Sequence, residues 1–81
     1  MNSNSLKSQL YEMLIKKAES DASEARMSLK ILSDHPAGIG DHSTGDFYSN
    51  AHEALAKLAE AEDRIECLKR NYSPISSNIN S

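Results

Sequence analysis

The chain has 81 residues, 38% of them hydrophobic, with three tyrosines, one phenylalanine and no tryptophan. One copy is therefore too small to bury a bulky, enzyme-like core, which favours assembly with further copies. The net charge of −3 argues against binding of DNA or RNA polymers, which takes a basic surface. Its one cysteine excludes an internal disulfide, and no apolar run predicts a signal peptide or a membrane span. We expect a cytosolic protein.

Residues 1–5 form a short polar lead, in which Ser3, Asn4 and Ser5 are good caps for a helix over about residues 6–33. Apolar or small residues recur in that helix at alternating spacings of four and three, which lays one seam along it. The seam consists of Tyr11, Ile15, Ala18, Ala22, Ala25, Leu29 and Leu32. A second stripe beside it, at Leu6, Leu10, Met13 and Leu14, is a candidate contact with another subunit.

A loop is predicted over residues 34–45, because most of the glycine and proline of the chain gathers there. Pro36 has no backbone N–H and restricts the residue before it, while Gly38 and Gly40 tolerate positive φ, so a helix must stop here. Successive N–H groups around Ile39 could also form a nest for an anion. A single Gly-Ile-Gly is a weak sign of such a nest, since most such sequences are only turns.

The second helix is expected over about residues 46–72, with Ser43, Thr44 and Asp46 as candidate caps. Its seam consists of Ala51, Ala54, Leu58, Ala61, Ile65, Leu68 and Tyr72. A further apolar surface is expected off this seam, at Phe47, Tyr48, Leu55 and Ala59. The polar tail, residues 73–81, is expected to be flexible.

These patterns predict an all-α fold, an antiparallel hairpin of two helices each about 40 Å long. Alanines in both seams allow the helix backbones to approach closely. Two such rods enclose almost no interior, and apolar residues remain on both arms. We therefore expect the hairpin to complete its core by homo-oligomerisation.

Catalytic and metal sites are not favoured by the residues near the loop. His35 and His42 lie close to aspartates, but neither a helical His-x-x-x-His motif nor a cysteine pair accompanies them. A triad of His42, Ser43 and Asp46 would lack the rigid pocket that such chemistry needs. We expect no enzyme, no cofactor and no metal.

One pair of residues on the first helix could bind a nucleotide between subunits. Tyr11 and Arg26 lie on nearly the same face but more than about 20 Å apart by the helical rise, so one subunit cannot bring both to a small ligand. Two antiparallel subunits could place an aromatic face for a base beside a guanidinium for a phosphate. The simpler interpretation is that Tyr11 belongs to the seam and Arg26 to the solvated surface.

Residues 36–42, Pro-Ala-Gly-Ile-Gly-Asp-His, and residues 59–65, Ala-Glu-Ala-Glu-Asp-Arg-Ile, resemble the second type of phage anti-CBASS proteins. That hairpin family also looks like part of an anti-Thoeris protein. The resemblance covers roughly residues 6–72. It implies a homohexamer in the host bacterial cytoplasm that sequesters cyclic oligonucleotide signals without degrading them.

The resemblance also implies two kinds of site. Cyclic dinucleotides such as cyclic GMP-AMP would be held between paired subunits by Tyr11 and Arg26, where the family has a lysine in place of the arginine. Cyclic trinucleotides such as cyclic tri-AMP would be held around a three-fold arrangement. The matching residues there are Gly38, Ile39 and Gly40 in the loop, with Arg64 or Lys69 as the cation of the second helix.

A different class of function is also consistent with the pattern. The spare apolar stripe could dock into the groove of a host protein, which would make the chain a helical adaptor or inhibitor. A stable monomer without affinity for nucleotides would favour that alternative.

Overall fold

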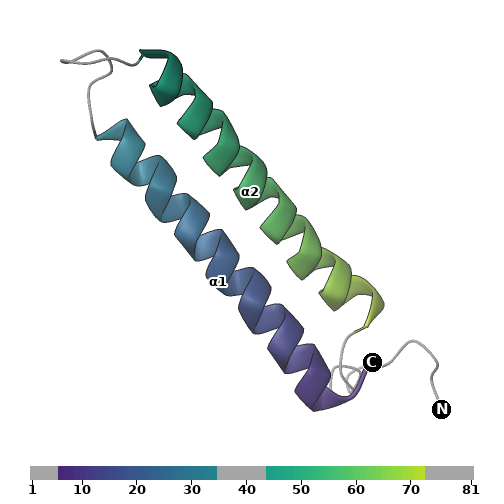
Figure 1. Ribbon diagram of the computed structural model, residues 1–81. Coiled ribbons are helices and arrows are strands. Elements are labelled where there is room, and N and C mark those ends of the chain that lie inside the picture. The colour runs from purple at the N-terminus through teal and green to yellow at the C-terminus, as the bar shows by residue number, and fades with distance from the viewer. Residues whose placement is uncertain (1–5, 35–43, 73–81) are drawn as a thin grey trace.

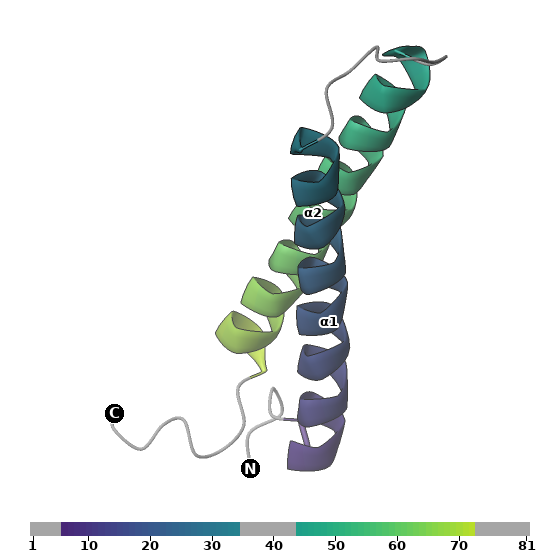
Figure 2. The same ribbon diagram turned by 90° about the vertical axis from the view of Figure 1, so that its left-hand side faces the viewer.

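The computed structural model describes residues 6–34 and 44–72. It contains two helices, α1 (Ser8–Ser33) and α2 (Thr44–Asn71), and no strand within these ranges. The helices pack side by side and run antiparallel (Figure 1). Figure 2, turned by 90°, shows that they cross rather than lying parallel. The expected all-α hairpin is thus confirmed within one chain.

Helix α1 begins two residues later than the sequence predicted. Lys7 occupies the N-cap position in an extended conformation, φ −62° and ψ 144°, without a capping hydrogen bond from its side chain. The prediction that residues 3–5 cap this helix is therefore wrong, and those residues lie outside the described ranges. At the other end, the Asp34 N–H donates to the carbonyl oxygens of Lys30 and Ile31, at 3.1 and 3.2 Å, which closes the last turn.

Helix α2 begins at Thr44, so Asp46 lies in its first turn and is not its cap. A carboxylate there still stabilises the helix, because the N-terminal N–H groups carry partial positive charge. At its end, Asn71 Nδ2 donates to the Cys67 carbonyl oxygen at 3.1 Å. Residues 35–43 and 73–81, which include most of the predicted loop and the whole predicted tail, lie outside the described residues.

The core lies along the two predicted seams. Tyr11, Ile15, Ala18, Ala22 and Ala25 are buried on α1, and Ala54 and Ala61 are buried on α2. The other seam positions are half-buried, except for Tyr72, which is exposed just past the end of α2. No large side chain among the described residues is fully buried. The hairpin therefore has a thin core of alanine contacts.

Phe47 corrects the predicted division of α2 into a seam and a further apolar surface. It is half-buried and precedes Ala51 by four residues, so it continues the seam toward the start of the helix. The exposed ring of Tyr48 packs edge-on against Phe47, with 5.7 Å between ring centroids and 69° between planes. The exposed apolar surface of α2 is thus smaller than predicted.

Outside its seam, α1 carries exposed apolar side chains near both of its ends. Leu10 and Met13 lie near the start, and Met27 and Ile31 lie near the end, each between 43% and 58% exposed. Only the first half of this stripe was predicted from the sequence. With the intervening polar residues Lys17, Ser20 and Glu24, these four residues keep the alternating spacing of three and four. We call these seven residues the outer stripe.

Candidate functional site

Tyr11 belongs to the packed core of the hairpin. Its side chain is only 8% exposed, on the face of α1 that packs against α2. This burial agrees with the place of Tyr11 in the seam. The ring therefore contributes to the packing of α1 on α2 within a single chain. A ligand that stacks on Tyr11 would have to share the ring with the core.

Arg26 is placed very differently. Its Nη2 atom lies 3.5 Å from Oε2 of Glu62, and both side chains are 56% exposed. A single exposed ion pair of this length contributes little to stability, because water and salt screen it. Within one chain the structure does not bring Arg26 to Tyr11, because Arg26 follows Tyr11 by fifteen positions on the same helix.

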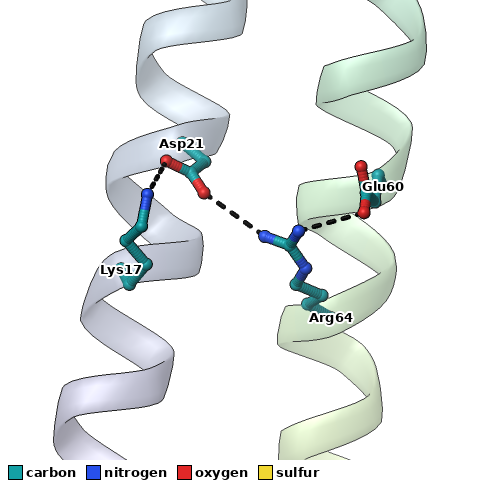
Figure 3. Close-up of polar contacts among 4 residues, drawn as sticks. All are labelled: Lys17, Asp21, Glu60 and Arg64. Carbon is teal, nitrogen blue, oxygen red and sulfur yellow. Dashed lines mark hydrogen bonds and ion pairs between the residues drawn. The ribbon is translucent and has the colours of Figure 1, made fainter.

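Arg64, one of the predicted trinucleotide contacts, lies in a chain of alternating charges across the hairpin (Figure 3). Its Nη1 lies 3.3 Å from Oδ2 of Asp21, and its Nη2 lies 3.0 Å from Oε2 of Glu60. The other carboxylate oxygen of Asp21 accepts a hydrogen bond of 2.9 Å from Lys17 Nζ. That hydrogen bond, with the added charge and hydrogen bond of Arg64, holds the pKa of Asp21 below its ordinary value despite partial burial.

Lys69, the other candidate cation of α2, lies exposed in the last turn of the helix. It follows Arg64 by five residues, which separates the two by about 140° around the helix axis. The two cations therefore belong to different faces of α2 and cannot serve one contact on a single chain. The three loop residues predicted for the same site, Gly38, Ile39 and Gly40, lie outside the described residues.

A groove of about 630 Å³ runs between the helices on the edge that carries Asp21 and Arg64. Its lining includes apolar side chains and six charged ones. The charged residues are Asp21, Glu24, Glu53, Glu60, Lys57 and Arg64. Because four acids face two cations, the groove of one chain disfavours a negatively charged ligand. This groove was not predicted from the sequence, since it depends on how α1 and α2 are aligned.

Arg26 lies on the opposite edge of the hairpin from this groove. It follows Asp21 by five residues, about 140° around α1. Its partner Glu62 shares a face of α2 with Leu55 and Tyr48, which precede it by seven and fourteen residues and are 55% and 57% exposed. This edge therefore combines an exposed guanidinium with exposed apolar and aromatic surface. Tyr48 is a candidate that sequence reasoning left out, although its heptad relation to Glu62 was visible.

The described residues contain no group of three histidine, cysteine, aspartate or glutamate side chains that could hold a metal ion. None of their helices is long and apolar enough to cross a membrane. Cys67 is a half-buried free thiol, and His52 is exposed.

No protein-family model, curated protein or solved structure matches this chain. The resemblance of residues 36–42 and 59–65 to phage anti-CBASS proteins accordingly remains an expectation, and function has to be argued from the chemistry of the side chains.

Proposed function

We propose that this protein captures cyclic di- and trinucleotides without cleaving them. In this proposal it is an immune-evasion protein of a bacteriophage, acting in the cytoplasm of the host bacterium. It would keep signal nucleotides from the effectors of CBASS-type defence, with Thoeris-type signals as a second target. The resemblance at the loop and on the second helix supports this ligand class. The observation that carries it on the described residues is the exposed, weakly held guanidinium of Arg26.

Arg26 suits a phosphate better than Arg64 does. Within residues 6–34 and 44–72, Arg26 has one carboxylate partner, at 3.5 Å, whereas Arg64 has two, at 3.0 and 3.3 Å. A phosphate that binds Arg26 through two hydrogen bonds would replace one long exposed pair and gain a stronger contact. A ligand at Arg64 would have to displace two carboxylates on the edge where acids predominate.

The proposal requires assembly, and a homohexamer is the expected form. Both helices leave apolar residues exposed, and the alanine core is thin. One hairpin therefore leaves apolar surface that further copies could cover. A hexamer of two-fold and three-fold symmetry needs two different interfaces. Tyr11 of one subunit and Arg26 of another would meet at one of them, and trinucleotides would lie near the three-fold axis.

Titration calorimetry with cyclic GMP-AMP tests the dinucleotide site. We expect micromolar or tighter binding, and heat denaturation of the complex should return the intact ligand. Arg26→Gln should weaken binding at least about tenfold, the loss of one charged hydrogen-bonding group. Arg70→Gln is the matched control, because Arg70 is also exposed and, among the described residues, is paired only with Glu66 of its own helix. Absence of binding by the unaltered protein would overturn the proposal, and hydrolysed product would make it an enzyme.

Glu62→Gln gives a second, opposite test of the same site. Because Glu62 competes with a phosphate for the guanidinium of Arg26, its neutralisation should leave cyclic GMP-AMP affinity unchanged or raise it. A marked loss of affinity in this variant would place the ligand elsewhere.

Cyclic tri-AMP tests the second ligand class in the same assay. Arg64→Gln and Lys69→Gln, measured separately, should identify which cation of α2 contacts the trinucleotide. The cyclic GMP-AMP affinity of both variants should be retained. If neither changes the affinity for cyclic tri-AMP, α2 contributes no cation to the site.

The adaptor alternative is favoured by one observation, the exposed methionines and leucines of α1. Such flexible apolar side chains are common on surfaces that bind helices or grooves of other proteins. Native mass and light scattering distinguish the two. A monomer without nucleotide affinity would support an adaptor, and an oligomer that carries nucleotide would support capture.

A further inference from the structure

We propose that the groove between α1 and α2 binds a basic, amphipathic helix of another protein. The occupant would lie along the hairpin and pack against both of its helices. The shape of the groove favours a helix, and the charges of its lining favour a basic one. Arg26 lies on the opposite edge of the hairpin, so this inference goes beyond nucleotide capture and does not depend on it.

The groove is long and follows both helices. Its lining runs from Asp21 to Leu32 on α1 and from Asn50 to Arg64 on α2. At the rise of an α-helix these stretches measure about 17 and 21 Å along the helix axes, or about three to four helical turns. An elongated occupant such as a helix of two heptads can therefore use the whole groove, whereas a compact small molecule would fill only part of it.

The residues that line the groove recur at helical spacing on both walls. On α2 they alternate by three and four positions, at Asn50, Glu53, Lys57, Glu60 and Arg64. On α1 they include residues spaced by four, three and four, which are Asp21, Ala25, Ser28 and Leu32. Each wall is therefore one stripe along its helix. A third helix has the same period and can pack against both stripes over several turns.

Small side chains lie at the base of the groove. Ala25 and Ala54 line it and are only 4% and 6% exposed, and Ser28 is a further small residue of the lining. Side chains of this size let another helix come close. Ile31 also lines the groove and is 51% exposed, so it offers apolar surface to the occupant. The occupant therefore needs one apolar stripe.

The charges of the lining favour a cationic occupant. Four carboxylates and two cations line the groove, and both cations already pair with carboxylates of the lining at 3.0 to 3.5 Å. Glu24 has no hydrogen-bond or ion-pair partner among the described residues. A lysine or arginine of the occupant would give Glu24 a charged hydrogen bond. Nucleic acids and anionic membrane surfaces carry the wrong charge for this edge.

The positions of these groups predict the residue pattern of the occupant. Glu24 follows Asp21 by less than one turn of α1, so it lies close to the level at which Asp21 contacts Arg64. Ile31 follows Glu24 by seven residues, which is about 10 Å or two helical turns further along the groove. The occupant should therefore carry a lysine or arginine about two turns away from an apolar side chain on the same face.

A labelled synthetic peptide with blocked ends provides the probe. Its two heptads have leucine at the first and fourth positions, lysine at the fifth and seventh, and alanine elsewhere. Fluorescence anisotropy should show binding in the micromolar range at low salt, and circular dichroism should show added helix in the mixture. The control peptide has the same composition with its leucines distributed around the helix. It should bind at least about tenfold more weakly, because it keeps the charge and loses the apolar stripe.

Reversal of the charge at Glu24 tests the place of binding. Glu24→Lys should weaken binding of the probe at least about tenfold, because it replaces an attractive charge in the groove by a repulsive one. Glu19→Lys is the matched control. Glu19 is also an exposed glutamate of α1 without an ion-pair partner among the described residues, but it does not line the groove. Both variants change the net charge equally, so a difference between them reports the position of the charge.

Ser28→Glu gives a test in the opposite direction. It adds a carboxylate to the lining one turn after Glu24, so it should tighten binding of the probe by about two- to fivefold. Ser20→Glu, at an exposed serine of α1 outside the lining, should leave the affinity unchanged. All four substituted residues are exposed, so the hairpin should fold in each variant, and circular dichroism of the variants alone checks this.

Each other outcome overturns the proposal. Equal affinity for the two peptides, or equal losses in Glu24→Lys and Glu19→Lys, would show that the probe senses only net charge. Absence of binding by the unaltered protein would show that the groove takes no such helix. An oligomeric native mass together with that absence would assign the groove to a second copy of this chain.

Discussion

Asp21 and Arg64 lie 43 residues apart in the sequence and form an ion pair across the hairpin, with 3.3 Å between Oδ2 and Nη1. Arg26 and Glu62 form a second pair on the opposite edge. The two pairs show which residues of α1 lie level with which residues of α2. Both pairs form in the single alignment that the two alanine seams adopt.

The first prediction concerns pH. The pKa of Asp21 is lower in the folded chain than in the unfolded chain, because Lys17 and Arg64 favour the carboxylate. Its contribution to stability is therefore complete above the unfolded value, about 4, and is lost as the pH falls through the lower folded value. Asp21→Asn should slightly lower the urea midpoint at pH 7, and its difference from the unaltered protein should shrink as the pH falls.

Asp63→Asn is the control for that measurement, because Asp63 is an exposed carboxylate without an ion-pair partner among the described residues. It should leave the urea midpoint unchanged at both values of pH. A loss of stability for Asp21→Asn that is as large at pH 2 as at pH 7 would exclude the ion pair as its cause.

The second prediction concerns the alanine seams. Ala22 and Ala61 are each only 1% exposed, so a larger side chain at either position forces the backbones apart. Ala22→Leu should lower the free energy of unfolding by about 1–3 kcal/mol, the usual cost of overpacking. Thermal unfolding followed by circular dichroism measures this loss. Ala56→Leu on the exposed surface of α2 is the control, and an equal loss there would contradict close packing as the reason.

The third prediction concerns Gly45 in the first turn of α2. A Cβ atom added there would meet nothing within 4 Å, and the residue needs no positive φ. Gly45→Ala should therefore raise the free energy of unfolding by about 0.5–1 kcal/mol, because alanine loses less backbone entropy in a helix. Urea unfolding would measure the gain. A destabilised variant would mean that the backbone at this position depends on glycine.

The fourth prediction separates the structural role of Tyr11 from a role in binding. Tyr11→Ala should cost about 3 kcal/mol of stability, since it removes a buried ring from a thin core. Tyr11→Phe keeps the packing and should stay close to the unaltered protein in stability. Urea unfolding measures the stability of both variants.

Binding of cyclic GMP-AMP should be retained by Tyr11→Phe if the ring face is what contacts the base. If Tyr11→Ala loses both its native mass and its nucleotide affinity while Tyr11→Phe keeps both, Tyr11 acts mainly through the fold. If a Tyr11→Ala protein of unaltered mass loses only the affinity, Tyr11 contacts the ligand.

Much of the fold follows from local patterns in the chain. The spacing of Ile15, Ala18 and Ala22 predicts the buried face of α1, and that of Ala54 and Ala61 predicts the buried face of α2. The structure confirms both. The predicted cap of α1 was wrong because several polar residues precede that helix, and cap preference alone does not choose among neighbouring positions.

The candidate site was less accessible from sequence. The separation of Tyr11 from Arg26 follows from the helical rise. The burial of Tyr11 against α2 and the pairing of Arg26 with Glu62 each involve two helices. The second half of the outer stripe, Met27 and Ile31, was visible in the heptad spacing and was missed because polar residues interrupt it.

The sequence by itself determined that two helices form, which faces they bury and that their contact is built from alanines, because helical periodicity and side-chain size are local properties. Only the tertiary structure decided the alignment of α1 with α2, and with it the pairs at Arg64 and Arg26, the acidic groove and the place of Phe47 in the seam. Small side chains of similar size allow several alignments of two helices. The one adopted depends on contacts summed over the whole length of the hairpin.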